Sequence, residues 1–118
     1  GCDWRILVTH LGLSWHERRH QLRRVADMLK AIDRPTVVMG DFNIWLSARG
    51  FAPLTRLGFA QCRLATFPTW PLPLLSLDRI FVGPSACAVR CARVMSAAAR
   101  VASDHYPICA DLRRAGAK

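Results

Sequence analysis

The stretch Thr36-Val37-Val38-Met39-Gly40-Asp41-Phe42-Asn43 decides the fold of this 118-residue chain. Its first four residues are apolar or β-branched, which is typical of a buried strand. Gly40, Asp41 and Asn43 follow directly, at the carboxyl end of that strand. A rigid scaffold that ends in polar acceptors can hold them for metal and proton chemistry. We therefore expect a candidate site at this strand end.

The Gly-Asp-x-Asn motif has two interpretations. If the chain stays extended through Asn43, the side chains of Asp41 and Asn43 emerge on one face, because strand side chains alternate. That geometry suits a metal-bound phosphate. In the alternative, the two residues form an Asx-type turn and satisfy local backbone donors. Taken alone, the motif favours the turn.

Upstream of this stretch, the sequence predicts a strand followed by a helix. The aliphatic run from Arg5 to Thr9 is typical of a buried strand whose end presents His10. Ser14 and Glu17 form a Ser-x-x-Glu capping box. Apolar residues then recur at steps of three and four: Leu22, Val25, Ala26, Leu29 and Ile32. These signals predict an amphipathic helix from about Trp15 to Ile32, which Arg34-Pro35 ends.

The polar face of the predicted helix is basic. It carries Arg18, Arg19, Arg23, Arg24 and Lys30, and the whole chain has a formal net charge of +9. A basic surface attracts phosphate-bearing partners without saying whether they are nucleic acids, lipid head groups or small phosphoesters. We favour a solvated helix face over a dedicated phosphate patch, and an arginine bias can also reflect genome composition.

Downstream, the sequence predicts a short helix or loop over 47–57 and an irregular loop over 65–75. The apolar residues of that loop either pack over the core, line a substrate groove or touch a membrane surface. A strand follows at Leu77 to Val82, and its Asp78 needs a partner, either Arg79 as an exposed neighbour or a distant histidine. A further strand is expected near 89–95. Alternating residues after Tyr106-Pro107 predict a half-buried last strand.

Length and composition allow one domain at most, with a real core. The first residue is Gly1 and the first strand begins almost at once, which we interpret as a sign of upstream truncation. No run of 18 apolar residues and no signal-like start is present. We expect a cytoplasmic protein without stable membrane insertion, with secretion or membrane association left open. The odd count of five cysteines favours free thiols over disulfides, and Cys87-x-x-x-Cys91 lacks a second pair at zinc-site spacing.

Four short motifs follow one another along the chain: Thr9-His10-Leu11, Gly40-Asp41-Phe42-Asn43, Leu77-Asp78-Arg79-Ile80 and Ser103-Asp104-His105-Tyr106-Pro107. In this order they resemble the C-terminal half of the endonuclease/exonuclease/phosphatase superfamily, which has the deoxyribonuclease I-like fold. The resemblance covers Trp4 to Leu112, and Ala65-Thr66-Phe67-Pro68 is similar to a run in bacterial members. It implies an α/β fold, half of a four-layer αββα sandwich, in which this chain supplies one mixed sheet with a flanking helix.

The resemblance also implies roles for individual residues. His105 would be the base that activates water, and Asp78 would orient its ring. Asp41 and Asn43 would contact the water, the phosphate and the metal environment, and His10 would donate to a phosphate oxygen. Asp104 would complete a metal site with Asp41, for Mg²⁺ with Mn²⁺ as a substitute. The implied reaction is hydrolysis of a phosphodiester or phosphomonoester.

One departure from the family pattern limits this expectation. Family members carry an asparagine and a metal-binding glutamate in an upstream half, whereas the only glutamate here is Glu17 of the helix cap. We therefore expect residues 1–118 to be the C-terminal part of a single domain, weak or inactive without its N-terminal half. The partners would be that half and a phosphoester, with nucleic acid and a phospholipid head group as the open alternatives. The alternative function is a catalytically incomplete module that binds phosphate or nucleic acid.

Overall fold

A computed structural model describes residues 3–31 and 33–116. Strands and helices alternate along the chain, with a 3-10 helix, η1, directly before the second α-helix. The elements are β1 (Arg5–His10), α1 (Trp15–Met28), β2 (Thr36–Asp41), η1 (Ala48–Phe51), α2 (Ala52–Thr55), β3 (Ala60–Arg63), β4 (Asp78–Val82), β5 (Ala86–Arg93), α3 (Ala97–Ala102) and β6 (Ile108–Arg114). The predicted α/β class is confirmed.

A mixed four-stranded sheet forms the middle layer, in the order β1-β2-β4-β3. β1 runs parallel to β2, and α1 is the crossover between them, as parallel pairing requires. β4 is antiparallel to both β2 and β3. In this register His10 pairs with Asp41, and Asp41 pairs with Asp78. The pairing of these strands therefore brings three of the four motifs together at one end of the sheet.

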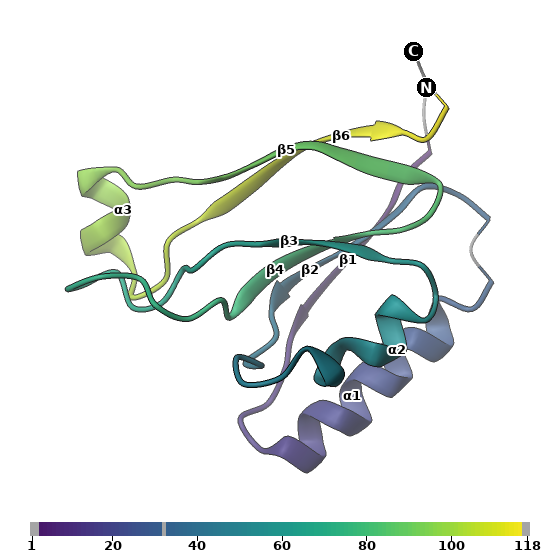
Figure 1. The fold of residues 1–118 in the computed structure, drawn as a ribbon, viewed down its shortest axis with the longest axis horizontal. Coiled ribbons are helices and arrows are strands. Elements are labelled where there is room, and N and C mark those ends of the chain that lie inside the picture. The colour runs from purple at the N-terminus through teal and green to yellow at the C-terminus, as the bar shows by residue number, and fades with distance from the viewer. Residues whose placement is uncertain (1–2, 32, 117–118) are drawn as a thin grey trace.

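Helix α1 covers one face of this sheet, together with α2 (Figure 1). Its start is fixed as predicted, because the Ser14 hydroxyl accepts a hydrogen bond from the backbone N–H of Glu17 at 3.1 Å. Leu22 and Leu29 are buried with Phe42 and Phe81 in the core under the helix. The helix ends at Met28, short of the expected end at Ile32, which lies outside the described residues.

A second sheet covers the opposite face. β5 and β6 pair antiparallel and pack across the mixed sheet from α1 (Figure 1). Apolar side chains fill the space between the layers, among them Val37, Ile80 and the partly buried Leu112. The expectation of a single sheet was therefore wrong, because β5 leaves β4 through a turn at Gly83 and joins another layer. The alternation predicted for the last strand is confirmed in β6.

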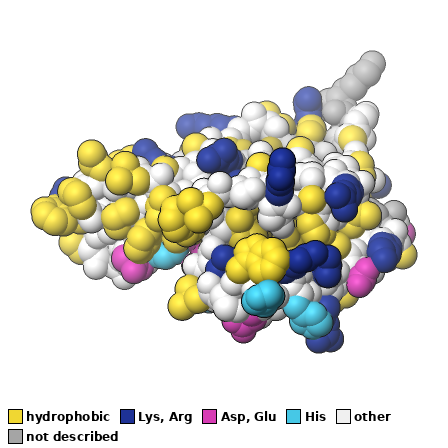
Figure 2. All heavy atoms as spheres, turned by 60° about the horizontal axis from the view of Figure 1, so that its bottom comes forward, with side chains coloured by type: hydrophobic (Ala, Val, Ile, Leu, Met, Phe, Trp, Pro, Cys, Tyr) yellow, Lys and Arg dark blue, Asp and Glu magenta, His cyan; other side chains and the backbone are white. Residues whose placement is uncertain are grey.

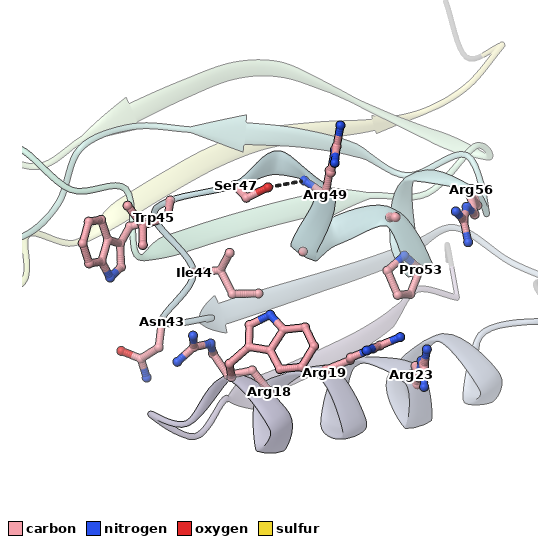
Figure 3. A pocket seen from close by; sticks show the side chains of 14 residues that line it. Arg18, Arg19, Arg23, Asn43, Ile44, Trp45, Ser47, Arg49, Pro53 and Arg56 are labelled. Carbon is pink, nitrogen blue, oxygen red and sulfur yellow. Dashed lines mark hydrogen bonds between the residues drawn. The ribbon is translucent and has the colours of Figure 1, made fainter.

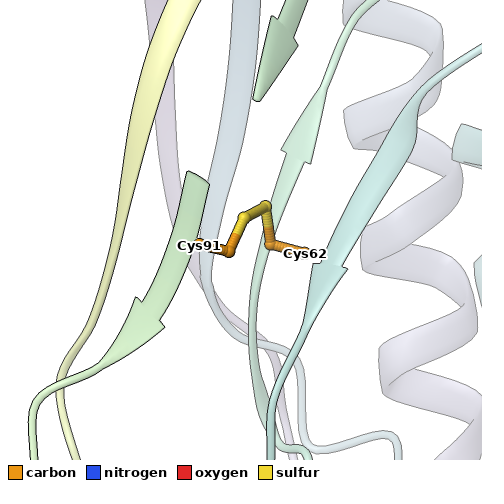
Figure 4. Close-up of a disulfide and its surroundings, with 2 residues drawn as sticks. All are labelled: Cys62 and Cys91. Atoms are coloured by element: carbon orange, nitrogen blue, oxygen red, sulfur yellow. A yellow bond between two sulfur atoms is a disulfide. The ribbon is translucent and has the colours of Figure 1, made fainter. Parts of the chain in front are cut away.

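The expectation of free thiols was also wrong for two cysteines. Cys62 of β3 and Cys91 of β5 form a disulfide that joins the two sheets (Figure 4). Their Cα atoms lie 6.2 Å apart although the residues are 29 positions apart in sequence. Cys87 and Cys109 are free, and Cys2 lies outside the described residues. Only the packing of one sheet on the other reveals this pairing.

The segments between strands follow the predictions in part. The short helix expected in 47–57 is η1 with α2, and the loop over 65–75 is irregular except for an isolated bridge between Phe67 and Leu75. β3 and α3 were not predicted from the sequence. Within 3–31 and 33–116, the helices are all too short or too polar to cross a membrane.

Candidate active site

The six predicted site residues meet at one end of the mixed sheet. β1, β2 and β4 carry His10, Asp41 and Asp78, respectively. Asn43 follows β2, and Asp104 and His105 lie between α3 and β6. These positions span most of the chain, and the strand register and the loop before β6 bring them together.

His105 is held by Asp78. Its Nδ1 lies 2.6 Å from Asp78 Oδ2, and the same oxygen accepts a hydrogen bond from the buried Thr66 hydroxyl at 2.5 Å. Because a carboxylate accepts hydrogen bonds, the imidazole carries its proton on Nδ1 when it is neutral. The free lone pair then sits on Nε2, which is the atom that can accept a proton.

Acidic side chains surround the free nitrogen. His105 Nε2 lies 3.9 Å from Asp41 Oδ2 and 3.9 Å from Asp104 Oδ1. Burial lowers the pKa of His105, but the hydrogen bond to Asp78 and the charges of Asp78, Asp41 and Asp104 outweigh burial and raise the pKa above 6.5. These three carboxylates therefore favour the protonated form of the His105 imidazole.

The Asx-turn interpretation of Asp41 and Asn43 is correct, and the extended alternative was wrong. Asn43 has φ 51° and its backbone N–H donates to Asp41 Oδ1 at 2.9 Å. The Asn43 side-chain amide donates to the carbonyl of Leu11 at 2.7 Å. The turn fixes the Asp41 carboxylate and leaves its Oδ2 facing the two histidines.

His10 lies at the outer rim of this cluster. Its Nε2 is 3.6 Å from Asp41 Oδ2, and its side chain is 78% exposed. Such an exposed imidazole is free to reach a ligand that approaches from solvent. Asp104 is similarly open, at 75% exposure, whereas Asp41, Asp78 and His105 are mostly covered.

The expectation that Arg79 is an exposed neighbour of Asp78 was wrong. Arg79 is only 4% exposed and lies over the ring of Phe51, with its guanidinium carbon 4.2 Å from the ring centroid. Successive strand residues point to opposite faces, so Arg79 turns away from Asp78 into the core. Burial, and then the charge of Arg63, lower its pKa to about 10. Asp78 is thus left to His105, the distant histidine of the two predicted alternatives.

The irregular loop before β4 positions the last motif, a role that the sequence reasoning missed. The Thr69 backbone N–H donates to the carbonyl of Asp104 at 3.0 Å, and its hydroxyl donates to that of Ser103 at 2.9 Å. Tyr106 donates its hydroxyl to the carbonyl of Thr69 at 3.2 Å. The one sequence signal for this loop was the run Ala65-Thr66-Phe67-Pro68, which is similar to a run in family members. The run does not show which residue Thr66 contacts.

The cluster suits a divalent cation by its charge and donor chemistry. Asp41, Asp78 and His105 can each offer one ligand atom within 4.8 Å of the others. Asp78 Oδ2 already accepts two hydrogen bonds, which removes it as the natural ligand. The oxygens left beside His105 belong to Asp41 and Asp104, and carboxylate oxygens are the donors that Mg²⁺ prefers. That group does not include Asp104, whose Oδ1 lies 3.9 Å from His105 Nε2, so the group alone does not complete the shell of such an ion.

Comparison with known proteins identifies what this arrangement is similar to. Residues 4–105 match the family model described as Endonuclease/Exonuclease/phosphatase family. No curated protein sequence matches the chain. Among solved structures, a functionally unknown conserved protein from Enterococcus faecalis V583 superposes with a TM-score of 0.79 at 22% identity, over 92% of this chain and 49% of that one.

Two further structures share the fold. The mannosyl-6-phosphatase Bt3783 of Bacteroides thetaiotaomicron VPI-5482 has a TM-score of 0.73 at 17% identity, over 92% of this chain and 50% of that one. D. rerio TDP2, complexed with a single strand DNA product, has a TM-score of 0.62 at 22% identity, over 92% and 55%. The chain therefore spans about half the length of the structures that it matches.

Proposed function

We propose that this chain, which belongs to the endonuclease/exonuclease/phosphatase family, supplies the base and part of the metal site of a phosphoester hydrolase. The observation that carries the proposal is the placement of His105. One of its nitrogens is bound to Asp78 at 2.6 Å, and the other faces Asp41 and Asp104. A carboxylate that orients an imidazole, with the second nitrogen free, is the arrangement of a general base.

The residues of the chain divide the chemistry among them. His105 Nε2 takes a proton from the attacking water, and Asp78 stabilises the imidazolium that results. Asp41, fixed by the Asx turn, orients that water and the phosphate with Asn43. His10, exposed at the rim, donates to a phosphate oxygen. A bond from the water oxygen to phosphorus forms and the bond to the leaving oxygen breaks. The leaving oxygen takes a proton from solvent water, and the His105 imidazolium returns its proton to solvent.

A divalent cation, Mg²⁺ or Mn²⁺, would be held by Asp41 and Asp104 and would neutralise the charge that builds up on the phosphate. Three carboxylates gathered in a protein of net charge +9 give a local negative potential that favours a cation at this place. The remaining ligands would come from water and from a further part of the domain.

We also propose that the chain forms the C-terminal part of one domain. It covers 49% and 50% of two structures that share its fold. The edge strand β1 exposes Ile6 by 61% and Val8 by 73%, which is apolar surface that another layer would cover. The other half of the fold would then supply the glutamate that family members bring to the metal.

The experiment is a hydrolysis assay of the full-length protein against a panel of phosphoesters. The panel includes a sugar 6-phosphate and a single-stranded oligonucleotide, because the similar structures include a phosphatase and a complex with a DNA product. We expect turnover that EDTA abolishes and that Mg²⁺ restores. His105→Ala should remove it, while His20→Ala, on the exposed surface of α1, should not.

Two results would contradict the proposal. Turnover that persists in EDTA would exclude a role for the metal ion. Turnover that persists in His105→Ala would exclude His105 as the base. A full-length protein that hydrolyses none of the substrates would favour the second candidate, a binding module. The observation that favours that candidate is that residues 3–31 and 33–116 contain one group of possible metal ligands, formed by Asp41, Asp78 and His105, and that Asp78 in it is already bound to His105 and Thr66.

A further inference from the structure

A groove opens beside the candidate active site, between α1 and the segment that contains η1 and α2. It has a volume of about 570 Å³. Figure 3 shows Arg19 and Arg23 on α1 on one side and Pro53 and Arg56 on the other, with Trp45 near Asn43 at one end. The groove is therefore a continuous surface that leads to the site.

The charge of the groove is entirely positive. Its lining contains five arginines and none of the acidic residues of the described chain: Arg18, Arg19, Arg23, Arg49 and Arg56. The ion pairs that the structure describes involve other cations, such as Lys30 with Asp27. Figure 2 shows basic side chains interleaved with hydrophobic ones on the face that bears α1 and α2. Arg18 donates a hydrogen bond to the carbonyl of Leu13, but none of the five guanidinium groups forms an ion pair with a carboxylate of the described residues, and such groups are suited to phosphate.

This packing changes the interpretation of the basic helix. The sequence favoured a solvated face, and it placed Arg24 and Lys30 with the other cations. The structure separates them, because only Arg18, Arg19 and Arg23 line the groove. Arg19 and Arg23 are four residues apart, or about one helical turn and ~6 Å along the axis. They can therefore contact successive positions of an extended ligand.

Two tryptophans add aromatic faces to the same surface. Trp15 is 57% exposed, and the guanidinium of Arg19 lies 5.1 Å from its ring centroid. Trp45 is 50% exposed, and no aromatic or cation–π partner is found for it in residues 3–31 and 33–116. An exposed indole beside arginines is the combination on which nucleic-acid bases stack.

We propose that this groove binds a single-stranded nucleic acid, with the arginines on its phosphates and Trp45 stacked on a base. Asn43 lines the groove and also forms the Asx turn that fixes Asp41, so the bound strand continues directly into the site. The inference deepens the proposed function and rests on it for the bond that reacts. The binding itself does not depend on catalysis.

A strand fits the groove better than a single phosphate does. One bidentate arginine is enough for an isolated phosphate, whereas five are spread here over α1, η1 and the C-cap of α2. A phospholipid head group would likewise leave most of them unpaired. A polymer with one charge and one base per unit uses both the arginines and the tryptophans.

The test measures binding without hydrolysis. Fluorescence anisotropy of a labelled 12-nucleotide oligo-dT is titrated with the full-length protein in EDTA at several salt concentrations. The groove variant is Arg19→Gln with Arg23→Gln. The matched control is Arg90→Gln with Arg114→Gln, which removes the same charge from exposed positions of β5 and β6. Trp45→Ala is a second groove variant.

We expect the double variant Arg19→Gln with Arg23→Gln, the groove pair, to weaken binding of oligo-dT at least tenfold more than the double control variant, the control pair. It should also reduce the slope of log K against log salt by about 1.4, or about 0.7 for each lost phosphate contact on a single strand. Trp45→Ala should weaken binding about fivefold or more.

Equal losses in the groove and control pairs would overturn the inference, because binding would then be diffuse electrostatics. Binding to phosphatidylserine vesicles but not to oligo-dT, lost in the groove pair, would replace the strand with a membrane surface. Failure of the proposed function is separate: it would show as turnover that survives His105→Ala in the phosphoester assay, whatever the anisotropy reports.

Discussion

At the scale of single residues, the candidate site depends on one nitrogen of one histidine. Asp78 and Thr66 fix the ring, so His105 Nε2 points to the space beside Asp41 and Asp104. The same carboxylates that favour a cation also raise the pKa of the imidazole. Two measurable consequences follow, one for turnover and one for stability.

Replacing Asp78 with Asn should slow hydrolysis and move its pH dependence. A base must be unprotonated, so kcat/KM of the full-length protein should rise with pH through a pKa above 6.5. Without the carboxylate, that rise should shift to lower pH and the plateau should fall by about 10²- to 10⁴-fold. Mg²⁺ affinity should stay nearly unchanged, and Asp111→Asn on exposed β6 is the control. Loss of metal binding in step with activity would make Asp78 a ligand instead.

His105 should also give stability its own pH dependence. Its folded-state pKa lies above the unfolded value of 6.5, because the three carboxylates outweigh the effect of burial. The stabilisation is therefore fully present below pH 6.5 and is lost as the pH rises through the folded pKa. Thermal unfolding between pH 5 and 9 should show this loss in the unchanged protein and not in His105→Gln. Identical pH profiles for both proteins would show that another group controls this range.

At the scale of elements, Arg79 connects the end of β4 to its surroundings. Its guanidinium donates to the side chain of Gln61 at 2.5 Å and to the carbonyls of Ser76 and Ile44 at 3.2 and 3.3 Å. These bonds link β4 to β3 and to the loop that follows the Asx turn. The hydrogen bonds of Arg79 thus stabilise the backbone near Asp78 and Asp41.

Truncating this side chain should destabilise the fold. Arg79→Ala leaves several acceptors without their donor and empties the space over Phe51, so the free energy of unfolding should fall by about 2–4 kcal/mol. The neighbouring Arg63 of β3 is exposed, and Arg63→Ala should change it by less than about 0.5 kcal/mol. Urea unfolding of both variants measures the difference. Equal midpoints would mean that the buried contacts of Arg79 contribute no net stability.

At the scale of the whole molecule, the chain has a buried apolar core, but the candidate site and the edge strand β1 are exposed. α1 and the mixed sheet bury the Phe42, Phe51 and Phe81 cluster, and the disulfide from Cys62 to Cys91 joins the second sheet to the first. The end of the sheet that carries the candidate site and the edge strand β1 remain exposed. We expect both to be completed by the other half of the family domain.

The 118 residues alone should therefore bind Mg²⁺ about 100-fold or more weakly than the full-length protein does, since even lost outer contacts cost 10- to 100-fold. They should show little hydrolysis and a tendency to associate through the exposed face of β1. Titration calorimetry and sedimentation measure these properties. Supplying the other half, in cis or as a separate polypeptide, should restore turnover except in His105→Ala. Strong EDTA-sensitive turnover by the 118 residues alone, lost in His105→Ala, would contradict the incompleteness and keep the assignment of His105.

Much of the fold could be predicted because its signals are local. The capping box at Ser14, the apolar period of the helix and the aliphatic runs of β1, β2 and β4 act between neighbours in the chain, so one sequence reveals them. The order of the four motifs indicated the family, and the resemblance to that family predicted the six site residues. β3 and α3 were missed, because short segments of four and six residues carry too little periodicity.

By itself, the sequence determined which residues have the chemistry for a site and which strands would carry them. The tertiary structure decided how those residues are used, because partners distant in sequence are chosen by strand register and layer packing. It turned Arg79 into the core, paired Cys62 with Cys91, and gave Asp78 both His105 and Thr66. The fold also places the arginines that line the groove close together in space. Side chains that are local neighbours in sequence point to opposite faces of a strand, so only the folded sheet determines which of them meet.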